Sequence, residues 1–275
     1  MSVLSDRDII RELSKGILFY PLKPDSIRAC DLCLTASEYA YAIGQKQRLT
    51  IQTELKTSKP DEEKKFFYIP PRDTALVWTD EAVYLSGYFR GPLYSMVGLV
   101  SKGMGHIGTR VNPYWSGVLC IALHNISDEM LRINVRDVNQ PIAYLAIEKL
   151  SSKSSSNRNT DRPARLDILI GLPNRNEIDD FFNRKEHSWM TGDTDLLRKL
   201  MLESEEYKKL KISVHETLLS FLGQDTSAKW AAVAAIGTLL SAIFAGIPLF
   251  QRVKTPTLEI RTEPNKTVNT PLNKK

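Results

Sequence analysis

The hydrophobic residues of the first 150 positions fall into short runs, and no helical repeat is visible after Ile27. Segments such as "TALVWTDEAVYL" (74–85) and "PIAYLAIEKL" (141–150) are rich in Val, Ile, Leu and Tyr, and Pro, Gly, Asn and Asp separate the runs. Short β-prone runs between turn residues are typical of antiparallel strands. From Ile27 to Leu150 we therefore expect an all-β domain, either a distorted barrel or a jelly-roll-like sandwich.

One short helix is expected before these strands, within "MSVLSDRDIIRELSKG". Ser5 stands where an N-cap is needed, and Asp6 and Asp8 lie in the first turn, where the helix dipole favours acidic side chains. Gly16 is expected to stop the helix.

The pattern changes after residue 150. "SSKSSSNRNTDRPAR" (151–165) is polar and predicts a loop, "LDILIGLP" (166–173) predicts a strand, and "NEIDDFFNR" (176–184) predicts a short helix. From about Thr191 an amphipathic helix is expected, which either packs on its own barrel or forms an oligomeric stalk. Ser204 and Lys211 interrupt the heptad, so a regular coiled coil is not predicted. The apolar stripe comprises Leu197, Leu200, Tyr207, Leu210, Val214, Leu218 and Phe221.

A long uncharged segment lies near the C-terminal end. Trp230 to Phe250, "WAAVAAIGTLLSAIFAGIPLF", is 21 residues without a charge, between Lys229 and Arg252. About 20 apolar residues suffice for a helix to cross a bilayer, so we expect a transmembrane helix rather than a buried core helix. Small residues recur in it every four positions, which lets helices approach closely in lipid.

The orientation of this helix rests on two opposing arguments. Four Lys/Arg closely follow the span and two precede it, which by the positive-inside rule favours a cytoplasmic tail. A 229-residue domain with three cysteines and no signal peptide is, however, hard to place outside the cell. We give the second argument more weight and expect a single-pass membrane protein with a cytoplasmic N-terminal domain.

The charge distribution argues against a nucleic-acid-binding domain. The chain carries a formal charge of +5, but residues 251–275 contain six Lys/Arg and two Glu and so account for +4 of it. The other 250 residues are close to neutral. A domain with so little excess positive charge lacks the electrostatic basis for binding nucleic acid.

Metal and redox chemistry are not expected either. Cys30 and Cys33 form a C-x-x-C pair, but "RACDLCLTA" alternates like a strand, and positions three apart on a strand point to opposite faces. We interpret both as structural cysteines. The four histidines have neither a partner four residues away nor a nearby ligand in suitable spacing, so no metal site and no cofactor are predicted.

Three common catalytic or nucleotide-binding signatures give no support for a site either. "GMGHIG" (103–108) matches G-x-G-x-x-G, but "TRVNPYWSG" after it offers a turn where a dinucleotide site needs a helix. No G-x-S-x-G elbow and no Walker-type loop occur.

Five stretches nevertheless occur in the order used by one family: "LSDRDI", "ACDLCL", "GYFRGPLYSMVGLVSKGM", "NPYWSGVLCIALHN" and "QPIAYLAIEKL". From Val3 to Leu150 the chain resembles the dCTP deaminase and dUTPase superfamily, and the deaminase branch most closely, because "LSDRDI" opening a helix is characteristic of that branch. The resemblance implies a distorted β-barrel that assembles as a homotrimer, with nucleotide sites at the subunit boundaries.

Several positions depart from the pattern of active deaminases. The family's Arg-Ser-Ser run and the following Leu-x-Arg correspond here to 96–98 and 99–101, "MVG" and "LVS". Asn112 replaces the Asp of the family turn Asp-Pro-Gly-Trp-Ser-Gly, and Ala122 stands where the deaminases use a Glu to move protons. A methyl group cannot relay a proton, so these departures predict a protein without deaminase activity.

The stretch Val111 to Asn125 is therefore interpreted as an active-site turn and strand kept for their shape. Trp115 and Gly117 preserve the turn, and His124 is interpreted as a structural histidine rather than a base. If a ligand pocket survives, Lys102 and Arg110 are the cations near enough in sequence to replace the missing phosphate-binding Arg. The alternative, which we favour for these two residues, is that both are solvated surface charges. The candidate ligand-binding residues are Ser95, Ser101, Lys102, Arg110, Asn112 and Tyr114.

These observations predict a mainly β protein in five parts. The predicted parts are a deaminase/dUTPase-like barrel with a short N-terminal helix (1–150), a loop with an extra strand and short helix (151–190), a helical stalk (191–229), a transmembrane helix (230–250) and a basic polar tail (251–275).

Three functional hypotheses remain open. The first is a non-catalytic sensor in which the barrel trimer binds a nucleotide or nucleotide-like signal and alters how the membrane helices associate, a layout that would suit a prokaryotic defence effector by analogy. The second is a trimeric, membrane-tethered scaffold that binds no ligand. The third is a residual enzyme that uses an unanticipated base such as His124 or Asp31.

Overall fold

The computed structural model describes residues 1–56, 59–105, 108–155 and 180–212. The chain divides into two compact units, Met1–His215 and Glu216–Lys275, and all the described residues belong to the first. Three of our predictions lie entirely outside the described residues: the strand at 166–173, the transmembrane helix at 230–250 and the basic tail. The predicted loop at 151–165, short helix at 176–184 and stalk at 191–229 are described only in part.

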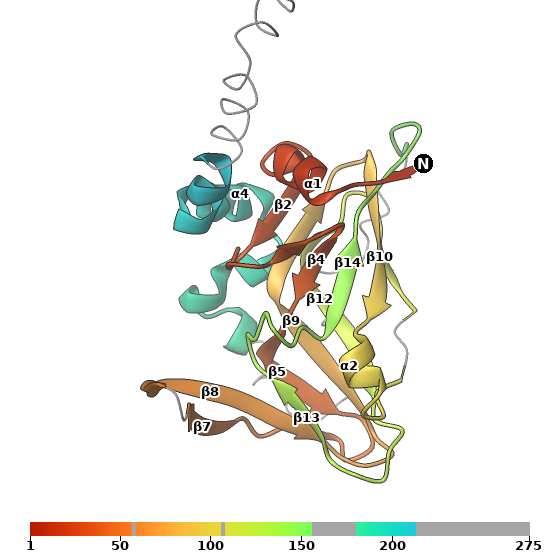
Figure 1. Cartoon of the computed structure of the whole chain (residues 1–275), viewed down its shortest axis with the longest axis vertical. Helices are drawn as coiled ribbons and strands as arrows, with labels where there is room; N and C mark the ends of the chain where they lie inside the picture. The colour runs from red at the N-terminus through yellow and green to blue at the C-terminus, as the bar shows by residue number, and fades with distance from the viewer. Residues whose placement is uncertain (57–58, 106–107, 156–179, 213–275) are drawn as a thin grey trace, which may run out of the picture. The chain divides into compact units, whose positions relative to one another are not determined.

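The first unit is built mainly from antiparallel strands in three curled sheets, as the sequence predicted (Figure 1). The largest sheet contains β1 (Ser2–Val3), β15 (Glu148–Lys149), β10 (Phe89–Ser95), β14 (Ala143–Ala146), β4 (Asp31–Leu34) and β3 (Ile27–Arg28), with β11 (Arg110–Val111) paired to β10. The second contains β12 (Ser116–His124), β9 (Thr74–Leu85), β5 (Ala36–Ala42) and β6 (Gln47–Arg48), with β2 (Ile17–Tyr20) paired to β9. The third consists of β13 (Leu131–Asn134), β8 (Lys59–Ile69) and β7 (Gln52–Lys56).

Strand β9 is the centre of the second sheet and of the core. It pairs with β2, β5 and β12, which explains why nearly every residue along it is buried. A strand covered on both faces has a continuous hydrophobic sequence, as "TALVW" and "AVYL" do. Between these two runs, β9 bulges, so that the three residues Thr79–Glu81 stand opposite the single Leu119 of β12.

Helix α1 (Asp6–Glu12) begins as predicted but ends early. Ser5 caps it, with its side chain accepting a hydrogen bond from the Asp8 backbone N–H while the Asp8 carboxylate accepts one from the Ser5 backbone. The helix ends at Glu12, not at Gly16, because Ser14 adopts a left-handed φ of 72° and its N–H turns to the carbonyl of Ile17. Gly16 instead permits close packing, since a Cβ there would lie 2.5 Å from the ring of Phe89.

Two further details differ from the predicted all-strand pattern. A short helix, α2 (Val97–Val100), follows β10 and begins after Met96 without a side-chain cap. Cys30 lies in the hairpin turn between β3 and β4, not on a strand, because Arg28 pairs with Asp31 and Ala29 takes a left-handed φ of 49°. Cys33 lies on β4 and is buried, as expected of a structural cysteine.

Helix α4 (Thr194–Glu203) packs against its own barrel. Asp193 caps it by accepting hydrogen bonds from two backbone N–H groups, and Leu197 and Met201 are fully buried on its inner face. The sulfur of Met201 lies 3.5 Å from the backbone nitrogen of Phe19 on β2. For the described part of the predicted stalk, packing on the barrel is thus the arrangement observed.

After α4 the chain remains mostly helical and keeps its contact with the barrel domain. Ser204 interrupts the helix, residues 205–212 are helical again, and the hydroxyl of Tyr207 donates to the Ser14 side chain at 2.9 Å. The remaining residues of the predicted stripe, Val214, Leu218 and Phe221, lie outside the described part. Among the described residues, no helix has the length and apolar character that a bilayer crossing requires.

Candidate functional site

The turn before β12 has a backbone that few sequences can adopt. Tyr114 has a φ of 64° and Gly117 a φ of 124°, both in the left-handed region that favours glycine. Hydrogen bonds hold the turn in place: the Tyr114 N–H donates to the carbonyl of Leu85 at 2.7 Å, and the Trp115 indole donates to the carbonyl of Gly117 at 3.2 Å. The predicted preservation of the turn's shape by Trp115 and Gly117 agrees with this geometry.

Strand β12 presents its even-numbered residues to one face. Ile121 and Leu123 are buried, whereas Cys120 and Ala122 are half-buried and His124 is exposed. Because side chains alternate along a strand, these last three lie on the same face. Ala122, at the position where a deaminase would carry its Glu, is thus on the side of the strand that also carries Cys120.

A cavity of about 280 Å³ lies against this face, beside strand β11. Arg110 and Asn112 are exposed at it and supply a guanidinium and an amide, two hydrogen-bond donors suited to an anion. Neither a carboxylate nor a histidine is among the described residues that line it. The lining residues are Leu93, Thr109, Arg110, Val111, Asn112, Trp115, Leu119 and Cys120.

A second opening of about 460 Å³ shares Thr109 and Arg110 with the first cavity. Arg90 also lines it, but that guanidinium is already paired with Glu148, at 2.6 Å between Nε and Oε2. Arg110, by contrast, has no ion pair with any described residue. It is therefore the cation at this site whose charge is available to a ligand.

The other predicted ligand-binding residues lie elsewhere in one chain. Tyr114 lines a different cavity, near helix α1. Ser95 ends strand β10, Ser101 donates to the carbonyl of Gly98 at 3.2 Å, and Lys102 is exposed beyond helix α2. None of these last three is among the described residues that line the Tyr114 cavity or the two openings at Arg110. Within one chain, the structure thus brings together Arg110 and Asn112.

His124 and Asp31, the two residues suggested as unanticipated bases, both lie in strand or hairpin positions away from the cavity at Arg110. The Nδ1 atom of His124 lies 2.8 Å from the Thr74 hydroxyl at the end of the β12–β9 ladder. Asp31 stands opposite Arg28 in the backbone ladder of the β3–β4 hairpin. Burial raises the pKa of the Asp31 carboxyl, although a hydrogen bond from Cys30 opposes that shift. Neither residue lines the cavity beside Arg110.

Asn125, which follows β12, organises a loop. Its side chain is 2% exposed, and its Nδ2 donates to the carbonyls of Ile69, Pro70 and Glu129 at 3.0, 2.9 and 2.7 Å. Its Oδ1 accepts from the backbone and the hydroxyl of Ser127 at 3.1 and 2.7 Å. A residue with all of its hydrogen-bonding capacity used in this way has a structural role.

A buried ionic cluster at the bulge in β9 was not predicted from the sequence. Lys23 Nζ lies 2.9 Å from the carboxylates of both Asp80 and Glu81. Arg136 Nε lies 2.8 Å from the other oxygen of Asp80, and Glu81 also accepts two hydrogen bonds from Thr35, at 2.6 and 2.7 Å. The signal for this cluster was present in "TALVWTDEAVYL", where two adjacent acids interrupt an otherwise mainly hydrophobic strand.

Burial dominates the protonation of Glu81. It is fully buried, which raises the pKa of its carboxyl, while the charge of Lys23 lowers it and the charge of Asp80 raises it further. For Lys23, burial lowers the pKa of the ammonium, but the two carboxylates outweigh that effect and raise it overall. The cluster balances its charges internally, which is how buried ion pairs persist.

The three cysteines lie in the described part of the chain, with Cys33 buried and Cys30 and Cys120 half-buried. No disulfide links Cys30, Cys33 or Cys120, and no three potential ligands cluster around a common point among the described residues. Burial raises the pKa of the Cys33 thiol to about 11, a condition that suppresses reactivity.

Comparison with known proteins supports the fold. The chain is similar to the dCTP deaminases of Pyrococcus abyssi and Pyrococcus furiosus, each 25% identical over 137 residues, which cover 50% of this chain and 81% and 80% of the relatives. No family model matches the sequence.

Solved structures of a dCTP deaminase and of a dUTPase also match part of the chain. The dCTP deaminase of Agrobacterium tumefaciens matches with a TM-score of 0.40 and 10% identity, over 53% of this chain and 47% of that chain, so the match spans about half the length of that enzyme. The dUTPase of EIAV matches with a TM-score of 0.28 and 18% identity, over 42% of this chain and 98% of that chain. Together with the curled antiparallel sheets, the sequence similarity supports a dCTP deaminase-like fold.

Proposed function

We propose that this protein is a non-catalytic, membrane-anchored member of the deaminase-like group that binds a nucleotide or nucleotide-like signal. The observation that carries the proposal is the cavity beside β11. It offers the guanidinium of Arg110 and the amide of Asn112, but no carboxylate or histidine among its described lining. Such a site can bind an anion, and its described lining offers neither of the two side-chain types, carboxylate and imidazole, that most often act as acid or base.

The position of Ala122 supports the absence of deamination. Hydrolytic deamination of a cytosine ring needs a group that takes a proton from water and returns it to the ring. Ala122 lies on the same face of β12 as Cys120, which lines the cavity, so this strand offers only a methyl group at that point. The nearest titratable side chain further along that face, His124, is next to Thr74 at the strand's end.

The proposed active form is a homo-oligomer, with a trimer as the expected number. Ser95, Ser101 and Lys102 are away from the Arg110 cavity in one chain, and contact between copies is the arrangement in which they could complete the site. Large apolar side chains near α2 favour such contact, because they are left in water in the single chain. These are Tyr94 on β10 and Val97 on α2, together with Ile126 and Met130 in the loop after β12, and they are between 53% and 81% exposed.

Membrane anchoring rests on the uncharged segment 230–250. In this proposal the barrel lies in the cytoplasm, and ligand binding changes how the anchoring helices associate. A ligand shifts such an equilibrium only by its difference in affinity between the two association states. A role as a defence effector would be one use of this coupling.

Ligand-induced stabilisation and turnover test the proposal together. The full chain, purified in detergent, is heated in the presence of deoxynucleotides, ribonucleotides or cyclic dinucleotides, and a ligand that binds at 100 times its Kd should add about 2.7 kcal/mol of stability. We expect one class to raise the melting temperature of the wild type and to lose that effect in Arg110→Gln.

Turnover is measured in parallel as release of ammonia from dCTP and of pyrophosphate from dUTP. Conversion that is abolished by a single substitution in the barrel would make the protein an enzyme and refute the proposal. A panel without any stabilising ligand at millimolar concentration would leave the scaffold hypothesis as the better account.

A further inference from the structure

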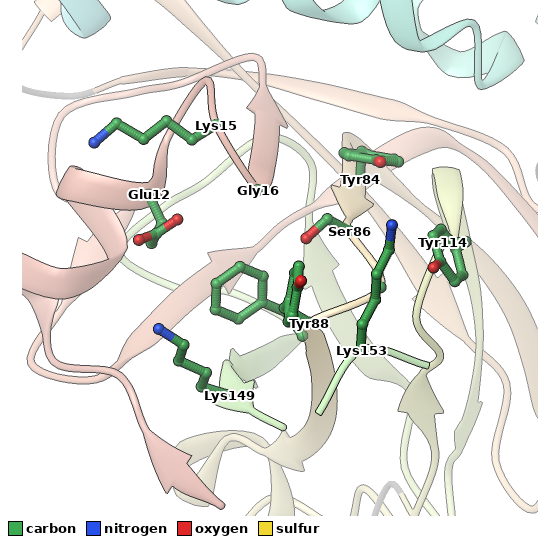
Figure 2. Close-up of a pocket in the computed structure, with 11 residues that line it drawn as sticks. Glu12, Lys15, Gly16, Tyr84, Ser86, Tyr88, Tyr114, Lys149 and Lys153 are labelled. Carbon is green, nitrogen blue, oxygen red and sulfur yellow. The ribbon is translucent and has the colours of Figure 1, made fainter. Parts of the chain in front are cut away.

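A cavity of about 440 Å³ lies between helix α1, the end of β9 and the start of β10, on residues that the nucleotide proposal does not use (Figure 2). Its volume is within the range of about 300–1,000 Å³ typical of small-molecule sites. The two cavities share no lining residue, since the first is lined by Arg110 and Asn112 and this one by lysines and tyrosines.

Three lysines from different segments stand around this cavity. Lys15 follows α1, Lys149 ends β15 and Lys153 lies just beyond it, and all three are exposed. None of their ammonium groups forms an ion pair with a described residue. Glu12 is the one carboxylate in the lining, so the described lining carries a net charge of +2.

The backbone holds two of these lysines in place. The N–H of Leu150 donates to the carbonyl of Tyr88 at 2.8 Å, and the N–H of Ser154 donates to the carbonyl of Gly87 at 2.8 Å. The hydroxyl of Tyr114 donates to the carbonyl of Ser154 at 2.9 Å. The segment that carries Lys149 and Lys153 is thus fastened across the 87–88 turn at both ends, which fixes their Cα positions before any ligand arrives.

Aromatic rings form the wall of the cavity. Tyr84, Tyr88 and Tyr114 line it, and Figure 2 shows Tyr88 in the middle, between Lys149 and Lys153. Tyr88 is 47% exposed, so about half of this residue remains accessible to a ligand. The close approach of Tyr114 requires a glycine beside it, since a Cβ on Gly87 would lie 2.2 Å from the Tyr114 hydroxyl oxygen.

We propose that this cavity is a second ligand site, which binds a phosphorylated aromatic small molecule such as a mononucleotide. The phosphates contact Lys149 and Lys153 from the fastened segment and Lys15 from the opposite side. The aromatic ring stacks on Tyr88, a contact that tolerates any base because every base has a π face. Ser86, which also lines the cavity, supplies a hydroxyl for the phosphate or the sugar.

Calorimetric titration of the full chain tests the site. The probes are dCTP and ATP, with tripolyphosphate as the arm without a ring and adenosine as the arm without a phosphate. The double variant Lys149→Gln/Lys153→Gln removes two charges while keeping two long side chains. Because exposed ion pairs contribute modestly, its Kd for the triphosphates should rise by about tenfold. Lys199→Gln, an exposed lysine on α4 outside this lining, is the matched control and should bind as the wild type does.

Two further variants separate this site from the one proposed above. Arg110→Gln should keep the binding that the double variant weakens, because Arg110 does not line this cavity. Tyr88→Ala should bind tripolyphosphate normally but lose the preference for ATP over it.

Each alternative outcome overturns the inference. It fails if the double variant binds like Lys199→Gln, or if neither dCTP nor ATP binds the Arg110→Gln protein at 1 mM, a concentration chosen as roughly the weak limit of specific small-molecule affinity. Loss of all binding in Arg110→Gln alone would support the first site and overturn this inference, whereas weaker binding in the double variant alone is the result that the inference expects. Equal binding of ATP and tripolyphosphate by the wild type would remove the ring-stacking role of Tyr88.

Discussion

Replacing Lys23 by Met isolates the energetics of the buried cluster in β9. The lysine side chain is 20% exposed, whereas Glu81 is fully buried, so the substitution leaves a carboxylate that only the neutral donors of Thr35 still contact. Breaking a buried pair by removing one partner costs about 3–5 kcal/mol. Because Lys23 is partly exposed, we expect a loss near the lower end, about 3 kcal/mol at pH 7.5.

The pH dependence follows from the same carboxylate. Without Lys23, Glu81 can become neutral by taking up a proton, at a cost of about 1.4 kcal/mol for each pH unit above its unfolded pKa. With an unfolded value of 4.5, that cost limits the loss to about 4 kcal/mol at pH 7.5 and about 1.4 kcal/mol at pH 5.5. An acid whose pKa is raised on folding binds more protons in the native state, so the variant gains stability relative to the wild type as the pH falls.

Thermal unfolding followed by tryptophan fluorescence measures both effects, and Trp189, whose indole donates to the Asp80 carbonyl at 2.9 Å, is next to the cluster. A loss of 3 kcal/mol corresponds to about 6–12 °C in a unit of this size. Lys23→Met/Glu81→Gln, which keeps the shape and removes the stranded charge, should recover most of the loss and its pH dependence. The reasoning is refuted if Lys23→Met melts within about 2 °C of the wild type at pH 7.5, less than 1 kcal/mol, or if its deficit is the same at both pH values.

Four other contacts lead to predictions of their own. Asn125→Leu should lower stability by about 2–4 kcal/mol, since it strands several buried polar groups, and urea unfolding would measure this. Met201→Ala should cost about 2–5 kcal/mol in the same assay through the cavity it leaves, whereas a helix that serves only as an oligomeric stalk would change the oligomer's mass in light scattering instead. Asp193→Ala should cost about 1 kcal/mol by removing the cap of α4, with little change if the helix is held by packing alone. Cys33 should resist iodoacetamide at pH 8 in the folded protein, because its pKa of about 11 leaves little thiolate, and rapid labelling seen by mass spectrometry would contradict this.

The fold class could be predicted because its signals are local. Short β-prone runs and their turn residues require no knowledge of the distant chain, and the N-cap at Ser5 depends on residues three positions away. The end of α1 was less predictable, because Gly16 carries a stop signal but is needed for packing against Phe89, a contact more than 70 positions away. Boundaries set by tertiary contacts of this kind leave little trace in a local pattern.

The site could be predicted only in part, for a similar reason. Arg110 and Asn112 are two positions apart, so proximity in sequence placed them correctly beside one cavity. The cavity at α1 collects Lys15 and Lys149 from opposite ends of the barrel domain, and nothing in either segment indicates the other. The acids at 80 and 81 were visible as charges in a buried strand, but their partner at 136 could be assigned only from the pairing of the strands.

The bulge in β9 also bears on how this strand could be shortened. Three residues, Thr79–Glu81, face one residue of β12, so the strand carries two more residues than a regular ladder would need. Loss of a single residue would turn one end of the strand inside out, because side chains alternate with a period of two. Loss of Asp80 and Glu81 together would preserve that alternation on both sides of the cut. On its other edge, however, β9 pairs with β5 up to Thr79 and with β2 from Ala82, so Asp80 and Glu81 also set the spacing between those two strands. Deleting the pair would bring the ends of β2 and β5 into adjoining positions on β9, and the two acids are therefore part of the barrel's closure and not a removable insertion.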